Sequence, residues 1–163
     1  MIFIEVGVVM VKETYGTNRP AMLMQSFWHL QKSIMGQVKQ TALNHDLSVP
    51  QFAIIVMMQH NKKIAQKQLQ ARTHYPKSTL SYAIEGLVQD DLLNRQYAEG
   101  NRREVDLILS EQGKALLKKM KNEENGVHLK FKNAVNSFSE EQFNDLLNLH
   151  QQIATFFEGG KMQ

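Results

Sequence analysis

The fold is decided by residues 64–89, which read IAQKQLQARTHYPKSTLSYAIEGLVQ. The second half of this stretch predicts an amphipathic helix over about 76–89, because its apolar residues recur at spacings of three and four. Pro76 suits the start of that helix, and a shorter helix is expected over about 65–72. The core-facing positions of the second helix are Leu80, Ala83, Ile84, Leu87 and Val88.

The opposite side of the second helix carries polar residues that cluster in its first turns. They are Lys77, Ser78, Ser81 and Tyr82, with Thr79 near the edge. Such side chains hydrogen-bond phosphates and base edges, and the first turns are where a recognition helix meets the major groove of DNA. The positive end of the helix dipole would then face phosphate. The alternative interpretation is an ordinary solvated helix face.

A β-hairpin is expected immediately after this helix pair. Over 92–109 the apolar residues alternate with polar ones, and Glu99-Gly100-Asn101 between the two alternating runs is a turn-forming cluster. Arg102 and Arg103 follow the turn, where a hairpin tip can reach an adjacent minor groove. An arginine-rich turn that only keeps the hairpin soluble is the alternative.

The flanking segments predict long helices. One begins after Pro20 and runs to about residue 45, and a second opens at the capping box Ser48-Val-Pro-Gln51 and ends near residue 60. Ser110 is expected to cap a long helix over about 110–137, and the capping box Ser139-Glu-Glu-Gln142 opens the last one. The first and last helices carry wide apolar stripes, which indicate burial on more than one side, as in a subunit interface. The predicted fold class is therefore mainly α with a small β-hairpin (α+β).

The charge of the chain is concentrated in its middle third. The 163 residues have a formal net charge of +3 and contain no cysteine. Residues 1–59, 60–105 and 106–163 have net charges of +1, +3 and −1, and residues 60–82 hold five basic groups and no acid. A basic centre between nearly neutral helical arms favours a nucleic-acid partner for the centre.

Membrane insertion, metal binding and catalysis find no support in the sequence. The apolar run over 2–11 contains Glu5, lacks a basic flank and is shorter than the roughly 20 residues of a membrane-spanning helix, so we expect a cytoplasmic protein. This run is either a short strand or arm, or a segment preceding a true start at Met10. The six histidines show no helical metal-ligand spacing, and no phosphate loop or nucleophile elbow is present. We therefore expect no enzyme activity, metal or cofactor.

From about residue 20 to 157 the chain resembles the MarR (multiple antibiotic resistance regulator) family of winged helix-turn-helix repressors. The resemblance is sharpest in Ser78-Thr-Leu-Ser81, in Gly86–Arg95, and in the wing motif followed by Ser/Thr-x-x-Gly, which Arg102, Arg103, Ser110 and Gly113 match. Two residues depart from the family's pattern. Asn101 stands where the family usually has Asp in the wing motif, and Tyr82 stands where Arg or Asn is common on the recognition helix.

The resemblance implies a division of the chain and a set of DNA-binding residues. Residues 1–18 would be an N-terminal extension, 19–45 and 110–158 dimerisation helices, and 46–109 the winged helix-turn-helix lobe. The residues expected to contact double-stranded DNA are Lys67, His74, Tyr75, Lys77, Ser78, Thr79, Ser81, Tyr82, Arg95, Arg102 and Arg103. His74 would contact phosphate or cap a turn.

The resemblance also implies a homodimer that places two recognition helices in successive major grooves, about 34 Å apart on a pseudo-palindromic operator. Family members often bind small aromatic or lipophilic effectors, and the methionines beside Phe27 and Trp28 could form a soft pocket or simply fill the core. A repressor released by such an effector is the leading hypothesis. The alternatives are a winged-helix protein-interaction module that does not read DNA and, third, a helical-bundle enzyme.

Overall fold

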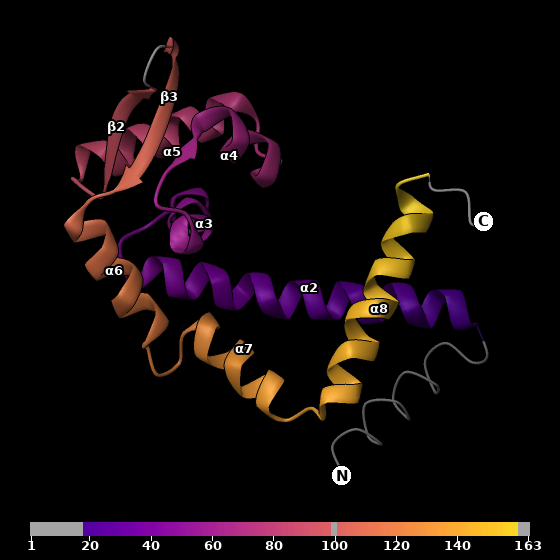
Figure 1. The fold of residues 1–163 in the computed structure, drawn as a ribbon. Helices are drawn as coiled ribbons and strands as arrows, with labels where there is room; N and C mark the ends of the chain where they lie inside the picture. Colours follow the sequence, from indigo (N-terminus) through magenta and orange to yellow (C-terminus); the bar gives the residue numbers. More distant parts are fainter. Residues whose placement is uncertain (1–17, 99–100, 160–163) are drawn as a thin grey trace.

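The structure, a computed structural model, describes residues 18–98 and 101–159 (Figure 1). This part of the chain holds seven α-helices and three short strands, so the predicted α+β class with a winged helix is confirmed. In chain order the elements are α2 (Arg19–Leu43), α3 (Val49–Met57), a 3-10 helix (Met58–His60), β1 (Ile64–Ala65), α4 (Gln66–Thr73), α5 (Lys77–Gln89), β2 (Leu93–Ala98), β3 (Asn101–Leu109), α6 (Glu111–Lys121), α7 (Val127–Asn136) and α8 (Glu140–Phe157). The apolar run over 2–11 and Met10 lie outside the described residues, as does the tip of the hairpin at 99–100.

The long helix α2 connects two ends of the molecule (Figure 1). The lobe formed by α3, α4, α5 and the sheet lies beside the C-terminal end of α2, and α8 crosses α2 near its N-terminal end. Helices α6 and α7 run from the lobe back along α2 toward α8. The chain therefore returns to α2 after completing the lobe.

Both predicted capping boxes are present and fix the starts of α3 and α8. The Ser48 N–H donates to Gln51 Oε1 over 2.8 Å, and the Ser139 N–H donates to Gln142 Oε1 over 2.9 Å. In return each serine hydroxyl accepts from the backbone N–H of the glutamine. Two of the N–H groups that a helix start leaves unpaired are thus satisfied in each case.

The prediction of a single helix over 110–137 is wrong, because α6 ends at Lys121 and α7 begins at Val127. The intervening Asn122-Glu-Glu-Asn-Gly126 contains two asparagines and a glycine, which are poor helix formers. Tertiary contacts hold this connecting segment against the C-terminal end of α2 and the residues that follow it. The buried Thr41 hydroxyl accepts from the Val127 N–H over 3.1 Å, and Glu123 lies 3.1 Å from His45 Nε2.

The sheet is antiparallel with the order β1-β3-β2, so the predicted hairpin is its larger part. Leu93 pairs with Leu109 across the hairpin, and Leu107 pairs with both Ile64 of β1 and Arg95 of β2. The two-residue strand β1 was not predicted, because so short a run has no detectable alternation. The buried leucines of the sheet pack against α5 and α3 to form one core.

The first turn of α6 lies directly against the backbone at the end of α5. The Ser110 hydroxyl donates to the Asp91 carbonyl over 2.5 Å and accepts from the Gly113 N–H over 2.9 Å. A Cβ at Gly113 would lie 2.2 Å from the Leu92 carbonyl oxygen, closer than any real contact. This close approach explains physically why the motif after the wing needs glycine at its fourth position.

We therefore expect Gly113→Ala to destabilise the chain by at least about 2 kcal/mol, because the new methyl group must displace backbone. The matched control is Gly36→Ala in α2, where a Cβ would meet nothing within 4 Å. That substitution should leave the free energy of unfolding unchanged or raise it by up to about 1 kcal/mol, since alanine favours helix. Urea unfolding of both variants measures the difference, and equal midpoints would contradict the close contact.

His128 of α7 packs its ring against Phe52 of α3, with the ring centroids 6.3 Å apart. Its Nε2 is buried and has no hydrogen-bond partner among the described residues. Burial, and secondarily the positive charge of Lys121, lower the pKa of His128 below its ordinary value of 6.5. The imidazole therefore stays neutral in the folded chain at neutral pH.

The unfolded chain takes up this proton at higher pH than the folded chain, so acidification favours unfolding. The stability associated with neutral His128 is complete above pH 6.5 and is lost as the pH falls from there through the lower pKa of the folded state. We expect His128→Gln to remove this part of the pH dependence. Urea unfolding of the wild type and of His128→Gln at pH 7.5 and 5.5 tests this. If both proteins lose the same free energy of unfolding between the two pH values, the assignment to His128 is contradicted.

Candidate nucleic-acid interface

Helix α5 divides into a buried side and an exposed side, as its sequence predicts. Leu80, Ala83, Ile84 and Leu87 are buried in the core. On the other side Lys77, Ser78 and Tyr82 are exposed, while Thr79 and Ser81 are half-buried at the edges. The structure thus brings these five polar residues of the first turns onto the side of the helix that faces away from the core.

The N-terminal end of α5 is open. Its N-cap is Pro76, no side chain accepts a hydrogen bond from the first turn, and the first turn contains no acidic residue. The backbone N–H groups there are accordingly available to an external acceptor. Lys77 at the first helical position adds a positive charge beside them.

The turn between α4 and α5 is held by backbone geometry. His74 ends α4 in the left-handed region, with φ of 54°. Tyr75 is half-buried and packs against the core. These two residues set the angle between the helices, and His74 remains exposed at the surface.

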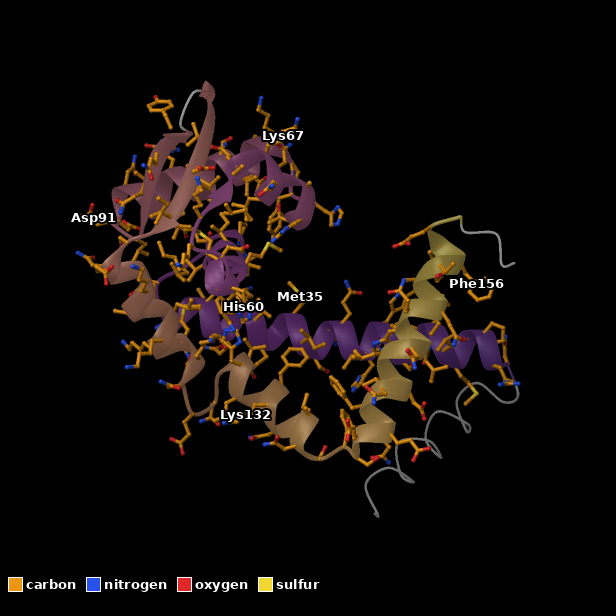
Figure 2. The ribbon with its side chains drawn as sticks, in the orientation of Figure 1. Met35, His60, Lys67, Asp91, Lys132 and Phe156 are labelled. Carbon is orange, nitrogen blue, oxygen red and sulfur yellow. The ribbon has the colours of Figure 1, made fainter. Side chains whose placement is uncertain are left out.

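Helix α4 is polar apart from Leu69, which is fully buried. Lys67 is exposed and projects from α4 at the end of the lobe where the β2–β3 hairpin also ends (Figure 2). Gln66, Gln68 and Gln70 supply amide groups along this short helix, and Arg72 in its last turn is also exposed. The exposed side of α4 therefore adds two cations, Lys67 and Arg72, and several amide groups to the same lobe.

Arg95 of β2 forms an ion pair with Glu85 of α5, with 2.8 Å between Nη1 and Oε2. Both side chains are partly exposed. The contact joins β2 to α5 and neutralises the carboxylate on the exposed side of that helix. Sequence reasoning missed this pair, because no periodicity connects positions ten residues apart on a helix and a strand.

The wing itself is a hairpin with a local irregularity near its tip. The regular register continues to the pair of Tyr97 and Val105, after which Ala98 pairs with Asn101. Arg102 and Arg103 belong to β3, and the placement of their side chains lies outside what the structure describes.

A second notable surface is an apolar groove of about 730 Å³ between the N-terminal half of α2 and α8. The Phe27 ring lies 5.9 Å from the His150 ring there. The lining residues are Pro20, Leu23, Met24, Phe27, Trp28, Gln31, His150, Ile153, Ala154 and Phe157. Phe27 and Trp28, beside which the sequence suggested a soft pocket, line this groove together with Met24, whereas Met58 of the 3-10 helix is in the core of the lobe.

Helices α2, α7 and α8 expose large apolar side chains well beyond this groove. No residue of the 18-residue helix α8 is buried, although it is strongly amphipathic. Leu149 and Phe156 of α8 are 54% and 64% exposed, and Phe131 of α7 is 51% exposed. Large apolar side chains exposed together on neighbouring helices are typical of a protein interaction site.

The described residues contain no group of three or more metal-ligating side chains placed to hold an ion. Among the helices that the structure describes, none is long and apolar enough to cross a membrane.

Comparisons with known proteins agree with this geometry. Residues 45–104 match the sequence model described as the MarR family. A search of curated proteins finds no match.

Solved structures share the fold at low sequence identity. AbsC of Streptomyces coelicolor, a MarR family transcriptional regulator, has a TM-score of 0.73 at 18% identity, covering 89% of this chain and 98% of its own. A MarR regulator from Methanosarcina mazei Go1 has a TM-score of 0.66 at 20% identity, covering 92% and 97%. BpsR of Bordetella bronchiseptica, whose DNA binding is regulated by 6-hydroxynicotinic acid, has a TM-score of 0.62 at 16% identity, covering 86% and 95%.

Proposed function

The winged-helix lobe of this chain belongs to the MarR family, and from that premise we propose that the protein is a cytoplasmic, DNA-binding transcriptional repressor. The observation that carries the proposal is the exposed side of α5, where Lys77, Ser78 and Tyr82 surround a helix start free of acidic groups. Inserted into a major groove, this end would place N–H groups and a cation at phosphate. The proposal assigns no catalytic role to the chain.

The remaining predicted contacts support this placement. Lys67 on α4 and His74 in the turn are exposed beside the recognition helix, and Arg102 and Arg103 follow the tip of the hairpin. Arg95 also favours DNA binding indirectly. Its ion pair neutralises the negative charge of Glu85, which would otherwise repel phosphate on the DNA-facing side of α5. We infer that residues 46–109 act as the DNA-binding lobe.

We further propose that the working unit is a homodimer formed by the helices over 19–45 and 110–158. The exposed apolar side chains of α2, α7 and α8 support this, since an amphipathic 18-residue helix with no buried residue needs a partner surface. A two-fold dimer would present two recognition helices to a pseudo-palindromic operator. A small aromatic or lipophilic effector that reaches these apolar helices would change the spacing of the lobes and release the operator.

A protein-interaction module is the second candidate, favoured by acidic residues near the surface. Asp90 and Asp91 are exposed at the C-terminal end of α5. They lie at the opposite end of the helix from Lys77. Their negative charges reduce the net positive charge of the lobe. A DNA-binding measurement separates the two functions.

For a duplex taken from upstream of its own gene, we expect tight binding that Lys77→Ala and Arg102→Ala each weaken. Each variant should also flatten the slope of log K against log salt concentration by about one unit, because one phosphate contact is lost. Gel shifts at several salt concentrations measure the slope.

The matched control is Lys132→Ala, which removes the same charge from an exposed position on α7, away from the lobe (Figure 2). It should leave both the affinity and the slope nearly unchanged. Binding that responds equally to all three substitutions would contradict the assigned surface, and no binding would favour the interaction module.

For the dimer, we expect Phe156→Glu to weaken self-association by at least about tenfold, because a large apolar side chain would lose its buried site in both protomers. Gln151→Glu adds the same charge to an exposed polar position of α8 and should have little effect. Sedimentation equilibrium gives the dissociation constants. A wild-type chain that is monomeric at micromolar concentration would contradict the proposal.

A further inference from the structure

Tyr82 is the most exposed of the large apolar and aromatic side chains that the structure describes in the lobe. It is 85% exposed, compared with 68% for Tyr97 of the wing. The preceding turn of α5 places Ser78 and Thr79 beside it, and the following turn places Glu85, which is paired with Arg95, and Gly86, which has no side chain. Within the described part of the chain its ring has no aromatic partner and its hydroxyl has no hydrogen bond. Nothing in the folded chain accounts for an aromatic ring at this position.

The ring stands at the end of α5 that would meet base edges. Side chains on a helix lean toward its N-terminus, so the ring of Tyr82 extends over the turn that begins at Ser78. In a major-groove recognition helix the N-terminal turns contact the bases. Tyr82 is therefore the longest group on the base-facing part of the helix.

The rest of this surface lacks the side chains that distinguish purines. Guanine is read mainly by arginine or lysine and adenine by asparagine or glutamine. Over 78–82 the outward residues offer three aliphatic hydroxyl groups, the methyl group of Thr79 and the phenol ring of Tyr82. Farther along, Glu85 is held by Arg95, and Gln89 is the last residue of the helix. Lys77 stands at the helix start, where it faces phosphate.

Hydroxyl groups donate to or accept from any base, so the groups with a chemical preference here are the Thr79 methyl group and the Tyr82 ring, and the ring is the more exposed of the two. The apolar group that B-DNA presents in the major groove is the C5-methyl of thymine. We propose that Tyr82 reads thymine methyl groups, and that the operator half-site carries thymine opposite this residue. The inference rests on the proposed DNA-binding function and names the feature of the DNA that α5 selects.

The test begins with selection of duplexes from a random pool by the full-length protein. Each recurrent thymine of a half-site is then replaced by deoxyuridine, which removes the methyl group and keeps every hydrogen-bonding group of the pair. For the wild-type protein we expect one position or two adjacent positions at which the change weakens binding about fourfold per methyl.

Three variants connect this sensitivity to the ring. Tyr82→Phe should retain the loss on deoxyuridine substitution, and Tyr82→Ala should bind the thymine and uracil duplexes equally. Tyr97→Ala, a change of the same size at the other exposed tyrosine of the lobe, should retain the loss.

Two results overturn the inference while leaving the proposed function intact. One is a selected operator whose binding is indifferent to deoxyuridine at every position. The other is a Tyr82→Ala variant with undiminished sensitivity, which would assign the methyl contact to another residue. Selection that enriches no sequence would instead reject sequence-specific DNA binding itself, and the inference with it.

Discussion

The burial of one side of α5 is the constraint on which the rest of the structure depends. Leu80, Ile84 and Leu87 are almost completely removed from water, each contributing about 1.5–3 kcal/mol. They pack in a single core with residues of every other element of the lobe, including the two-residue strand β1. Because the helix cannot rotate without exposing these side chains, the direction of its polar side is fixed as well. The surface that would meet DNA is thus a consequence of packing.

The connections around the lobe transmit this fixed orientation to the helical arms. The contact of Gly113 with the Leu92 carbonyl fixes where α6 leaves the sheet. The hydrogen bond from the Val127 N–H to Thr41 then ties the start of α7 to the end of α2. Through these two contacts α6 and α7 connect the sheet of the lobe to the end of α2.

The molecule has two surfaces that a folded monomer leaves without a partner, and they differ in chemistry. The lobe exposes a polar helix face with one prominent aromatic ring, whereas α2, α7 and α8 expose leucine, methionine and phenylalanine. Polar hydroxyls and amides suit a hydrated, charged partner, and large apolar side chains suit another protein surface. The lobe lies beside the C-terminal end of α2, whereas α8 crosses α2 near its N-terminal end (Figure 1), so α5 and α8 are well separated.

The sequence by itself determined the elements whose causes are local. The capping boxes at Ser48 and Ser139, the amphipathic pattern of α5 and the alternation of the hairpin each arise from neighbouring residues, so they were predictable from spacing alone. Only the tertiary structure decided the break between α6 and α7, the third strand, and the pairing of Arg95 with Glu85. The physical reason is distance along the chain. Thr41 and Val127, or Glu85 and Arg95, meet only because the core has already brought their elements together, and no local pattern encodes such a meeting.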